Sequence, residues 1–241
     1  DALTALNPLY TVGTQLAEPF RIHQGLSAKD AKRKAVDLMA RVGIPQPETR
    51  LNSYPHQFSG GMRQRAMIAM ALINDPRLII ADEPTTALDV TVQAQILDLL
   101  RDLQTEFGSS IIIITHDLGV VAEMAEHILV MYGGRAVERG SVDDIFYAPE
   151  HPYAWGLLSS MPRMDRVREE RLRPIAGNPP SLINPPAGCV FNPRCPYVDE
   201  ARLGCVSKPP AFDESSPHPV RCHIPHETRR EIFQTKVKPT L

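Results

Sequence analysis

Two carboxylates, Asp82 and Glu83, directly follow the short apolar run 78–81. A run of this length and composition predicts a strand buried on both faces of a parallel sheet. Ligands of open α/β sheets bind at the carboxyl ends of the strands, and Mg²⁺ prefers oxygen ligands. Asp82 is therefore a candidate Mg²⁺ ligand, and Glu83 is a candidate to orient or deprotonate a water that attacks a phosphate. Taken alone, such a pair is also typical of an acidic surface at a strand end.

A second candidate site is the turn Ser59-Gly60-Gly61, which precedes a run with helical spacing. The free N–H groups at a helix N-terminus attract phosphate oxygens, and glycine lets the backbone approach closely. Taken alone, Ser59 fits an ordinary N-cap in a flexible turn equally well. Because the turn and the acidic pair occur in this order and this close, they together indicate a site that hydrolyses a nucleoside triphosphate.

Two further polar residues follow the same pattern. His116 comes directly after a second apolar run, 111–114, and Asp89 follows the acidic pair by a few residues. An imidazole at that strand end is placed to contact a γ-phosphate oxygen across the crevice from Glu83. Asp89 is also the expected N-cap of the helix that begins near Val92.

The elements that must position these residues alternate along the chain. Ser27 predicts the start of a helix that ends at Gly43, the Ser-Gly-Gly turn opens a second helix, and spacing predicts a third over 92–107. The strand 78–81, this third helix and the strand 111–114 predict a parallel sheet with a right-handed crossover. The segments 128–131 and 135–138 predict a hairpin. The expected fold is therefore α/β.

Composition sets the limits on class. With 241 residues, 43% hydrophobic and 22% charged, the chain is long enough for one or two globular domains. A net charge of -2 argues against bulk nucleic-acid binding. The longest aliphatic runs are too short to span a bilayer, and the first residues do not form a signal peptide. Proline becomes frequent after about His151, which predicts a loop-rich extension.

The cysteines gather in this extension, at spacings of Cys-x5-Cys-x9-Cys-x16-Cys. Four cysteines in a local cluster indicate a metal site before they indicate disulfides. Structural zinc sites usually contain close Cys-x2-4-Cys pairs, which are absent here, and four thiolates can equally hold a [4Fe–4S] cluster. The residues alone leave iron–sulfur, zinc and free thiols open, with these candidate ligands: Cys189, Cys195, Cys205 and Cys222.

Taken together, these motifs resemble the ATP-binding subunit of an ATP-binding-cassette (ABC) transporter. The segment 58–62 is similar to the family signature, with Phe58 and Met62 in place of the usual Leu and Gln. By the same resemblance, 78–82 corresponds to the Walker B strand, Glu83 to the catalytic carboxylate, 86–89 to the D-loop and His116 to the switch histidine. The family then implies a partial P-loop (RecA-like) parallel sheet, an inserted α-helical subdomain and ATP with Mg²⁺ as ligands.

Further segments resemble the ATPases of the dipeptide, oligopeptide and nickel importers: 6–8, 54–57, 151–153, 180–182, 186–189 and 193–196. This resemblance favours the [4Fe–4S] cluster among the three alternatives for the cysteines. It also implies three regions: the end of the Q-loop with the helical and signature subdomain (1–75), the remainder of the ATPase core (76–150) and the importer-type extension with the four cysteines (151–241).

One departure from the family is that no Gly-x-x-x-x-Gly-Lys-Ser/Thr (Walker A) run occurs in the chain. The residues 1–4 resemble the segment that follows the glutamine of the Q-loop, so we expect an N-terminally truncated chain that is inactive alone. In the family two subunits sandwich ATP, with the signature of one facing the Walker A of the other, which implies that Ser59 can act on the partner's nucleotide. The resemblance also gives these residues as nucleotide-binding: Gly60, Gly61, Asp82 and Asp89.

The resemblance therefore implies an ATPase that energises import of peptides or a related small solute. Its implied partners are transmembrane permease subunits, a second ATPase subunit and, indirectly, an extracytoplasmic solute-binding protein, with no nucleic acid. The implied location is peripheral, on the cytoplasmic face of the inner membrane. Two alternative functions remain open. One is a soluble ABC ATPase of DNA repair or translation, and the other is an inactive fragment whose only functional site is the metal cluster.

Overall fold

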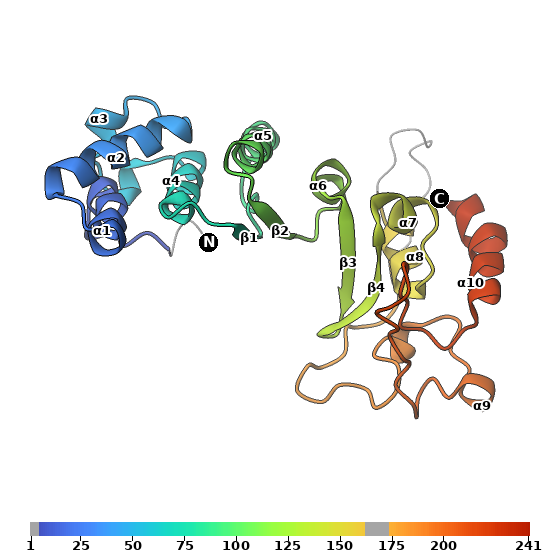
Figure 1. The fold of residues 1–241 in the computed structure, drawn as a ribbon. Coiled ribbons are helices and arrows are strands. Elements are labelled where there is room, and N and C mark those ends of the chain that lie inside the picture. Colours follow the sequence, from blue (N-terminus) through green and yellow to red (C-terminus); the bar gives the residue numbers. More distant parts are fainter. Residues whose placement is uncertain (1–4, 162–173) are drawn as a thin grey trace. The chain divides into compact units, whose positions relative to one another are not determined.

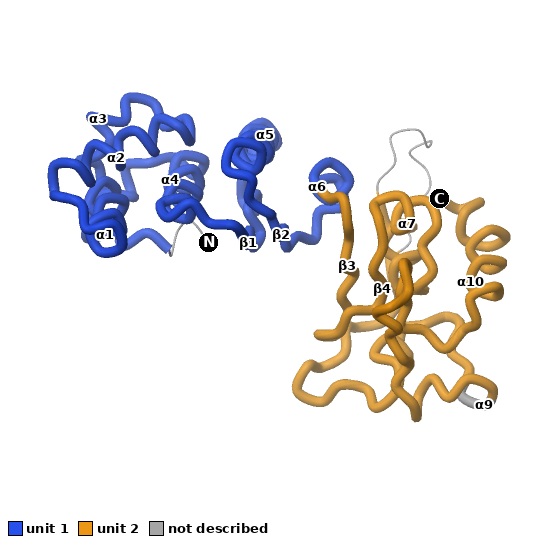
Figure 2. The backbone as a smooth tube through the Cα atoms, viewed as in Figure 1, with its two compact units in different colours: residues 1–124 blue, residues 125–241 orange. Residues whose placement is uncertain are grey.

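The computed structural model of the chain describes residues 5–161 and 174–241. The segment 1–4, expected to follow the glutamine of a Q-loop, lies outside these described residues. The chain divides into two compact units, residues 1–124 and residues 125–241, coloured separately in Figure 2.

The first unit contains a helical part followed by a strand–helix–strand part (Figure 1). The helical part consists of α1 (Val12–Gln24), α2 (Ala28–Arg41), α3 (Pro47–Arg50), the short 3₁₀ helix η1 (Pro55–Gln57) and α4 (Gly60–Leu72). The remainder is β1 (Leu78–Asp82), α5 (Val90–Phe107), β2 (Ser110–Ile114) and α6 (Leu118–Met124).

Side-chain caps begin the helices of this unit where the sequence predicts them. Ser27 accepts a hydrogen bond from the backbone N–H of Asp30 and starts α2. Ser59 and Asp89 cap α4 and α5 in the same way. Each cap satisfies one of the N–H groups that the first turn of a helix leaves unpaired. The predicted helix starts at Ser27, Ser59 and Asp89 are therefore confirmed.

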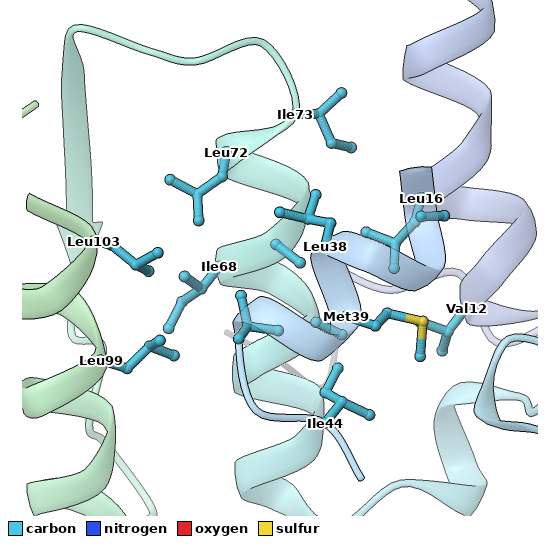
Figure 3. Close-up of a cluster of buried hydrophobic side chains, with 14 of the residues drawn as sticks. Val12, Leu16, Leu38, Met39, Ile44, Ile68, Leu72, Ile73, Leu99 and Leu103 are labelled. Atoms are coloured by element: carbon cyan, nitrogen blue, oxygen red, sulfur yellow. The ribbon is translucent and has the colours of Figure 1, made fainter. Parts of the chain in front are cut away.

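The apolar faces of these helices meet in one core. Figure 3 shows side chains of α1, α2, α4 and α5 directed toward one another. The cluster is almost free of solvent and contains, among others, Val12, Leu16, Leu38, Met39, Ile68, Leu72, Leu99 and Leu103. Burial of each such side chain contributes on the order of 1.5–3 kcal/mol. The core therefore fixes the position of the α4 N-terminus, where the Ser-Gly-Gly turn lies.

The two predicted strands of this unit pair in parallel, as expected, with Asp82 opposite Ile114. One face of the pair packs on the core through Ile79 and Ile111. The expectation that both faces are buried is wrong for this structure, because Ile80 is 63% exposed and Ile112 is 48% exposed. The described residues of the unit supply a helical layer on one side of the pair only.

The second unit is built on the hairpin of β3 (His127–Tyr132) and β4 (Arg135–Ser141), which pair antiparallel as predicted. The segment 219–221 runs along β4: Arg139 N–H donates to Pro219 and Arg221 N–H to Val137. The other elements are α7 (Val142–Tyr147), α8 (Pro152–Ser159), η2 (Asn192–Arg194), α9 (Glu200–Leu203), α10 (His226–Ile232), η3 (Phe233–Val237) and η4 (Lys238–Thr240).

Two apolar clusters hold the second unit together. The first joins the hairpin to the loop-rich segment through Val137 and Phe191, and the second docks η3 on α8 through Trp155 and Phe233. Irregular segments 174–191 and 204–225 connect these anchors, in agreement with the proline-rich sequence. In the part of the chain that the structure describes, no helix is long and apolar enough to cross a membrane.

The first prediction concerns the shared core of the first unit. Ile96 on α5 is fully buried, so Ile96→Ala is expected to lower the free energy of unfolding by about 3 kcal/mol through lost burial and a cavity. Val90→Ala on the same helix, at a side chain 84% exposed, is the matched control and is expected to change it little. Denaturant unfolding measures both, and equal effects of the two substitutions would contradict the described packing.

Candidate functional site

The carboxylate of Glu83 lies at the carboxyl end of β1, where the parallel pair directs it toward the end of β2. The backbone N–H of Glu83 donates to the carbonyl of Ile114 at 2.9 Å, so the strand ends are joined one residue past the ladder. Glu83 adopts φ +50°, a left-handed conformation that non-glycine residues rarely take. Such local strain often marks functional sites, since the surrounding structure must maintain it.

Two side chains hold the Glu83 carboxylate, one at each oxygen. The Thr86 hydroxyl donates to Oε2 at 2.6 Å, and His116 Nδ1 lies 2.8 Å from Oε1. Because an ionised carboxylate only accepts hydrogen bonds, Nδ1 must carry the proton, which leaves Nε2 facing outward. The sequence predicted that Glu83 and His116 lie at neighbouring strand ends; the structure brings them into direct contact.

These contacts change the acidity of both groups. The hydrogen bond from Thr86, followed by that from His116, lowers the pKa of Glu83 below its ordinary value. The hydrogen bond to Glu83 and the negative charge of that group raise the pKa of His116. The pair therefore favours an ionised carboxylate beside a protonated imidazole, with the His116 ring 81% exposed.

Asp117, the residue after His116, fixes this loop through two contacts, and the role of its partner Gln93 was not predicted from the sequence. Asp117 Oδ1 accepts from the backbone N–H of Gly119 at 2.8 Å, which stabilises the turn into α6. Gln93 of α5 donates to the other oxygen of Asp117 at 3.3 Å. The contact of Gln93 has no sequence signal, because Gln93 and Asp117 are 24 residues apart and meet only after the strands pair.

The Ser-Gly-Gly turn forms the N-terminus of α4. Ser59 Oγ accepts from the backbone N–H of Met62 at 3.2 Å, so the interpretation of Ser59 as an N-cap is correct. Its hydroxyl proton is not used by that bond and can still be donated. The dipole of the 13-residue helix adds a partial positive charge at this end. The N-terminus of α4 is therefore suited to bind an anion.

Gly61 permits a close approach between this turn and α5. A Cβ at Gly61 would lie 2.7 Å from Cγ1 of Val92, which no ordinary side chain contact allows. The start of α5, capped by Asp89 through a 3.0 Å bond to Val92 N–H, therefore lies against the turn. No hydrogen bond joins Ser59 to Glu83 in the part of the chain that the structure describes, so the two motifs are separate features of one unit.

In the second unit the four cysteines line one pocket, although they come from well-separated positions of the sequence. All four are free thiols. Burial raises the pKa of Cys195 to about 12 and that of Cys222 to about 11. Within residues 5–161 and 174–241, no group of three or more His, Cys, Asp or Glu side chains converges closely enough to hold a metal ion as it stands.

A close backbone contact brings the first and third of these cysteines together. The N–H of Cys189 donates to the carbonyl of Cys205 at 2.8 Å. A Cβ at Gly188 would lie 2.3 Å from the same carbonyl oxygen, so only glycine permits this approach. The path of the backbone around the pocket therefore requires glycine at position 188, directly before Cys189.

A buried glutamate, Glu138 of β4, holds two other walls of the pocket in place. Its carboxylate is fully buried and accepts from the backbone N–H groups of Glu150 and His151, at 2.7 and 2.9 Å. It also accepts from His218 Nε2 at 2.7 Å. Sequence reasoning missed this network, since its members span 80 residues and no motif marks them. It ties the segment before α8 and the segment before Cys222 to the hairpin.

His151, at the end of this network, is a buried imidazole that lines the cysteine pocket. Its Nδ1 accepts from the backbone N–H of Tyr153 at 3.1 Å and so caps α8. Burial lowers the pKa of His151 to about 3, so the ring is neutral. Its Nε2 makes no hydrogen bond of acceptable geometry, although the nearby carbonyl of Arg221 favours the charged ring. An unpaired buried donor costs about 1–3 kcal/mol.

Solved structures and a family model define the class of the first unit. The model described as "ABC transporter" matches residues 2–86. The chain is similar to the ATP-binding cassette MJ0796 in a dimeric post-hydrolysis state bound to ADP and Pi, at 31% identity and a TM-score of 0.51, over 57% of this chain and 59% of that one. A second dimeric structure of MJ0796 matches with a TM-score of 0.50 at the same identity and coverage. The fold is that of an ABC cassette.

Similar proteins and a second family model indicate a narrower class within the ABC cassettes. The model described as "Oligopeptide/dipeptide transporter, C-terminal region" matches residues 137–201. The chain is 53% identical to the oligopeptide transport ATP-binding protein OppD of Bacillus subtilis (strain 168), over 94% of this chain and 63% of that protein. It is 52% identical to a putative peptide import ATP-binding protein of Brucella melitensis biotype 1, over 92% and 67%. The dipeptide transport protein DppD of B. subtilis is 56% identical over 81% and 58%.

The chain belongs to the ABC transporter ATPases, in the branch that carries the oligopeptide/dipeptide transporter C-terminal region. It spans about two thirds or less of the length of these curated relatives. The resemblance inferred from the motifs is thereby confirmed at the level of the family and of the α/β fold.

A second prediction tests the contact at the strand ends. Because Glu83 raises the pKa of His116, Glu83→Gln removes the partner charge and is expected to move titration of the His116 ring to lower pH. Histidine ring resonances followed by NMR against pH measure the shift, and Glu18→Gln on α1 is the exposed control. An unchanged His116 titration in Glu83→Gln would contradict the pairing.

Proposed function

We propose that this chain carries the catalytic carboxylate and the signature of an ATP-hydrolysing subunit that energises peptide import by an ABC transporter. The observation that carries the proposal is the Glu83 carboxylate held between Thr86 and His116 at the carboxyl ends of two parallel strands. Ligands of α/β sheets bind at such ends. The roles of the relatives OppD and DppD in oligopeptide and dipeptide transport support the choice of solute class.

The contacts of Glu83 suggest how it acts. Its lowered pKa makes it a weak base, so it is better suited to orient an attacking water than to take up a proton early. Asp82, one residue earlier on the strand, would hold Mg²⁺, which neutralises charge on the phosphates. His116 keeps Nε2 free and has a raised pKa, so a protonated ring can donate to a γ-phosphate oxygen.

The Ser59-Gly60-Gly61 turn serves a different nucleotide in this proposal. The free N–H groups at the start of α4, with the Ser59 hydroxyl, suit phosphate oxygens of ATP held by a second ATPase subunit. Asp89 lies on the segment that Gly61 brings against the turn, and we assign it to the same subunit contact. Both MJ0796 structures are dimeric, which supports this arrangement.

The further partners follow from the family. We propose that transmembrane permease subunits bind the helical part, 12–74, so that hydrolysis is coupled to their motion. A solute-binding protein would deliver the peptide to the permease. The site of action is the cytoplasmic face of the inner membrane, with this subunit attached peripherally. The match of 137–201 to the transporter C-terminal region argues against an ATPase of DNA repair or translation.

For the second unit, we propose a [4Fe–4S] cluster held by Cys189, Cys195, Cys205 and Cys222. All four thiols line one pocket and none forms a disulfide, which supports a shared ligand. Each iron of such a cluster takes one thiolate, so the sulfurs need not converge on a single point as they must around zinc. Bound iron would also offset the cost of deprotonating buried thiols, and it supplies a one-electron centre.

The third prediction addresses ATP hydrolysis. Glu83→Gln is expected to lower ATP turnover by at least about 100-fold and to trap an ATP-bound dimer, because the residue that orients water is lost. Phosphate release and size-exclusion chromatography with ATP measure these effects.

The exposed Glu48→Gln on α3 is the control for that experiment, since it makes the same chemical change outside the site. Near-normal hydrolysis by Glu83→Gln would remove Glu83 from its assigned role. Binding of the protein to nucleic acid rather than to permease subunits in a pull-down would favour the alternative class of ABC ATPase.

The fourth prediction addresses the cysteine site. Protein prepared without oxygen is expected to contain iron and acid-labile sulfide and to show broad absorbance near the visible blue, and Cys205→Ser or an iron chelator is expected to remove both. Metal and sulfide analysis with absorbance spectroscopy tests this. Stoichiometric zinc without sulfide, or no metal at all, would contradict the cluster.

A further inference from the structure

Among the polar side chains that line the pocket of the four cysteines, His151 has a buried nitrogen, Nε2, without a hydrogen-bond partner in the described residues. The ring is 1% exposed and lines the pocket. Since Nδ1 accepts from Tyr153, the neutral ring must carry its proton on Nε2. That donor has no hydrogen-bond partner in the part of the chain that the structure describes. Buried donors are nearly always paired, and the nearby carbonyl of Arg221 does not meet hydrogen-bond geometry, so this donor remains open to a better-placed acceptor.

The ring cannot easily turn away to find a partner elsewhere. The backbone N–H of His151 donates to the buried Glu138 carboxylate at 2.9 Å. The ring packs near Phe191, with centroids 5.9 Å apart, and Phe191 lines the same pocket. The N-cap contact to Tyr153 fixes the other edge of the ring. The backbone, one face and one nitrogen of the ring are therefore all held, which leaves Nε2 as the unpaired nitrogen of a residue that lines the pocket.

We propose that His151 Nε2 donates a hydrogen bond to a sulfur of the iron–sulfur group in this pocket, either a cluster sulfide or a ligating thiolate. This inference rests on the proposed cluster and deepens it. An N–H donor favours the state with more negative charge on sulfur, which is the reduced one, and hydrogen bonds to the sulfurs are known to tune cluster potentials. His151 is then a positioning residue that raises the reduction potential, in addition to its role as an N-cap.

The roles of Nδ1 and Nε2 can be tested separately by replacing His151 with each of the two amide side chains, Asn and Gln. The Asn side chain places its amide near the position of Nδ1, so His151→Asn retains the acceptor for Tyr153 and removes the Nε2 donor. The longer Gln side chain places its amide near Nε2, so His151→Gln retains the donor and removes the cap. His127→Gln, at an exposed ring on β3, is the control.

The readouts are iron and sulfide content, the midpoint potential of the cluster and the melting temperature of the full chain prepared anaerobically. We expect a more negative potential in His151→Asn with unchanged iron content, a potential close to wild type in His151→Gln with a lower melting temperature, and no change in His127→Gln. A wild-type potential in iron-replete His151→Asn would overturn the inference and leave the cluster standing.

A second measurement tests the inference without His151→Asn, in case that variant does not fold. In protein labelled with ¹⁵N-histidine, the reduced cluster is expected to show a magnetic coupling to a histidine nitrogen by pulsed electron paramagnetic resonance, and His151→Gln is expected to lose it. No coupling in the wild type, or a coupling that persists in His151→Gln, would overturn the inference. Wild-type protein without iron would overturn the cluster and this inference together.

Discussion

The parallel pairing of β1 with β2 is the constraint on which the candidate ATPase site depends. Because Asp82 lies opposite Ile114, the residues that follow each strand leave the sheet at the same edge. Glu83 and His116 meet there although they are 33 residues apart in sequence. The one-residue extension of the ladder, from Glu83 N–H to Ile114, forces the turn in which Thr86 reaches the second carboxylate oxygen. A slip in register would separate the side chain of His116 from that of Glu83.

The second unit depends in the same way on one buried charge. Glu138 accepts three hydrogen bonds, from two backbone N–H groups and His218, and so joins the hairpin, the start of α8 and the segment that leads to Cys222. A buried carboxylate is tolerated only when it is paired in this way. These segments also form walls of the cysteine pocket. The hydrogen bonds of Glu138 therefore support the proposed cluster site as well.

The sequence predicted those features that depend on neighbouring residues. Helix starts at Ser27 and Asp89, the hairpin and the pairing of two apolar strands all follow from local caps, turns and periodicity. The prediction that both faces of the strands are buried was wrong, since burial depends on which layers cover the two faces of the sheet. The contacts of Thr86, Gln93 and Glu138 could not be predicted either, because each requires the tertiary fold to bring distant or differently facing groups together. The cysteines were predicted as a cluster, but their common pocket depends on Gly188 and Glu138.

We propose that the strand ends and the Ser-Gly-Gly turn bind phosphates of two different nucleotides. Hydrogen exchange of the protein, with and without a non-hydrolysable ATP analogue and Mg²⁺, tests this proposal most directly. Slower exchange is expected at 83–86 and 115–117 whenever nucleotide binds, and slower exchange is expected at 60–61 only at protein concentrations at which subunits associate. Unchanged exchange at all three segments while nucleotide is bound, or protection of 60–61 in the monomer, would contradict it.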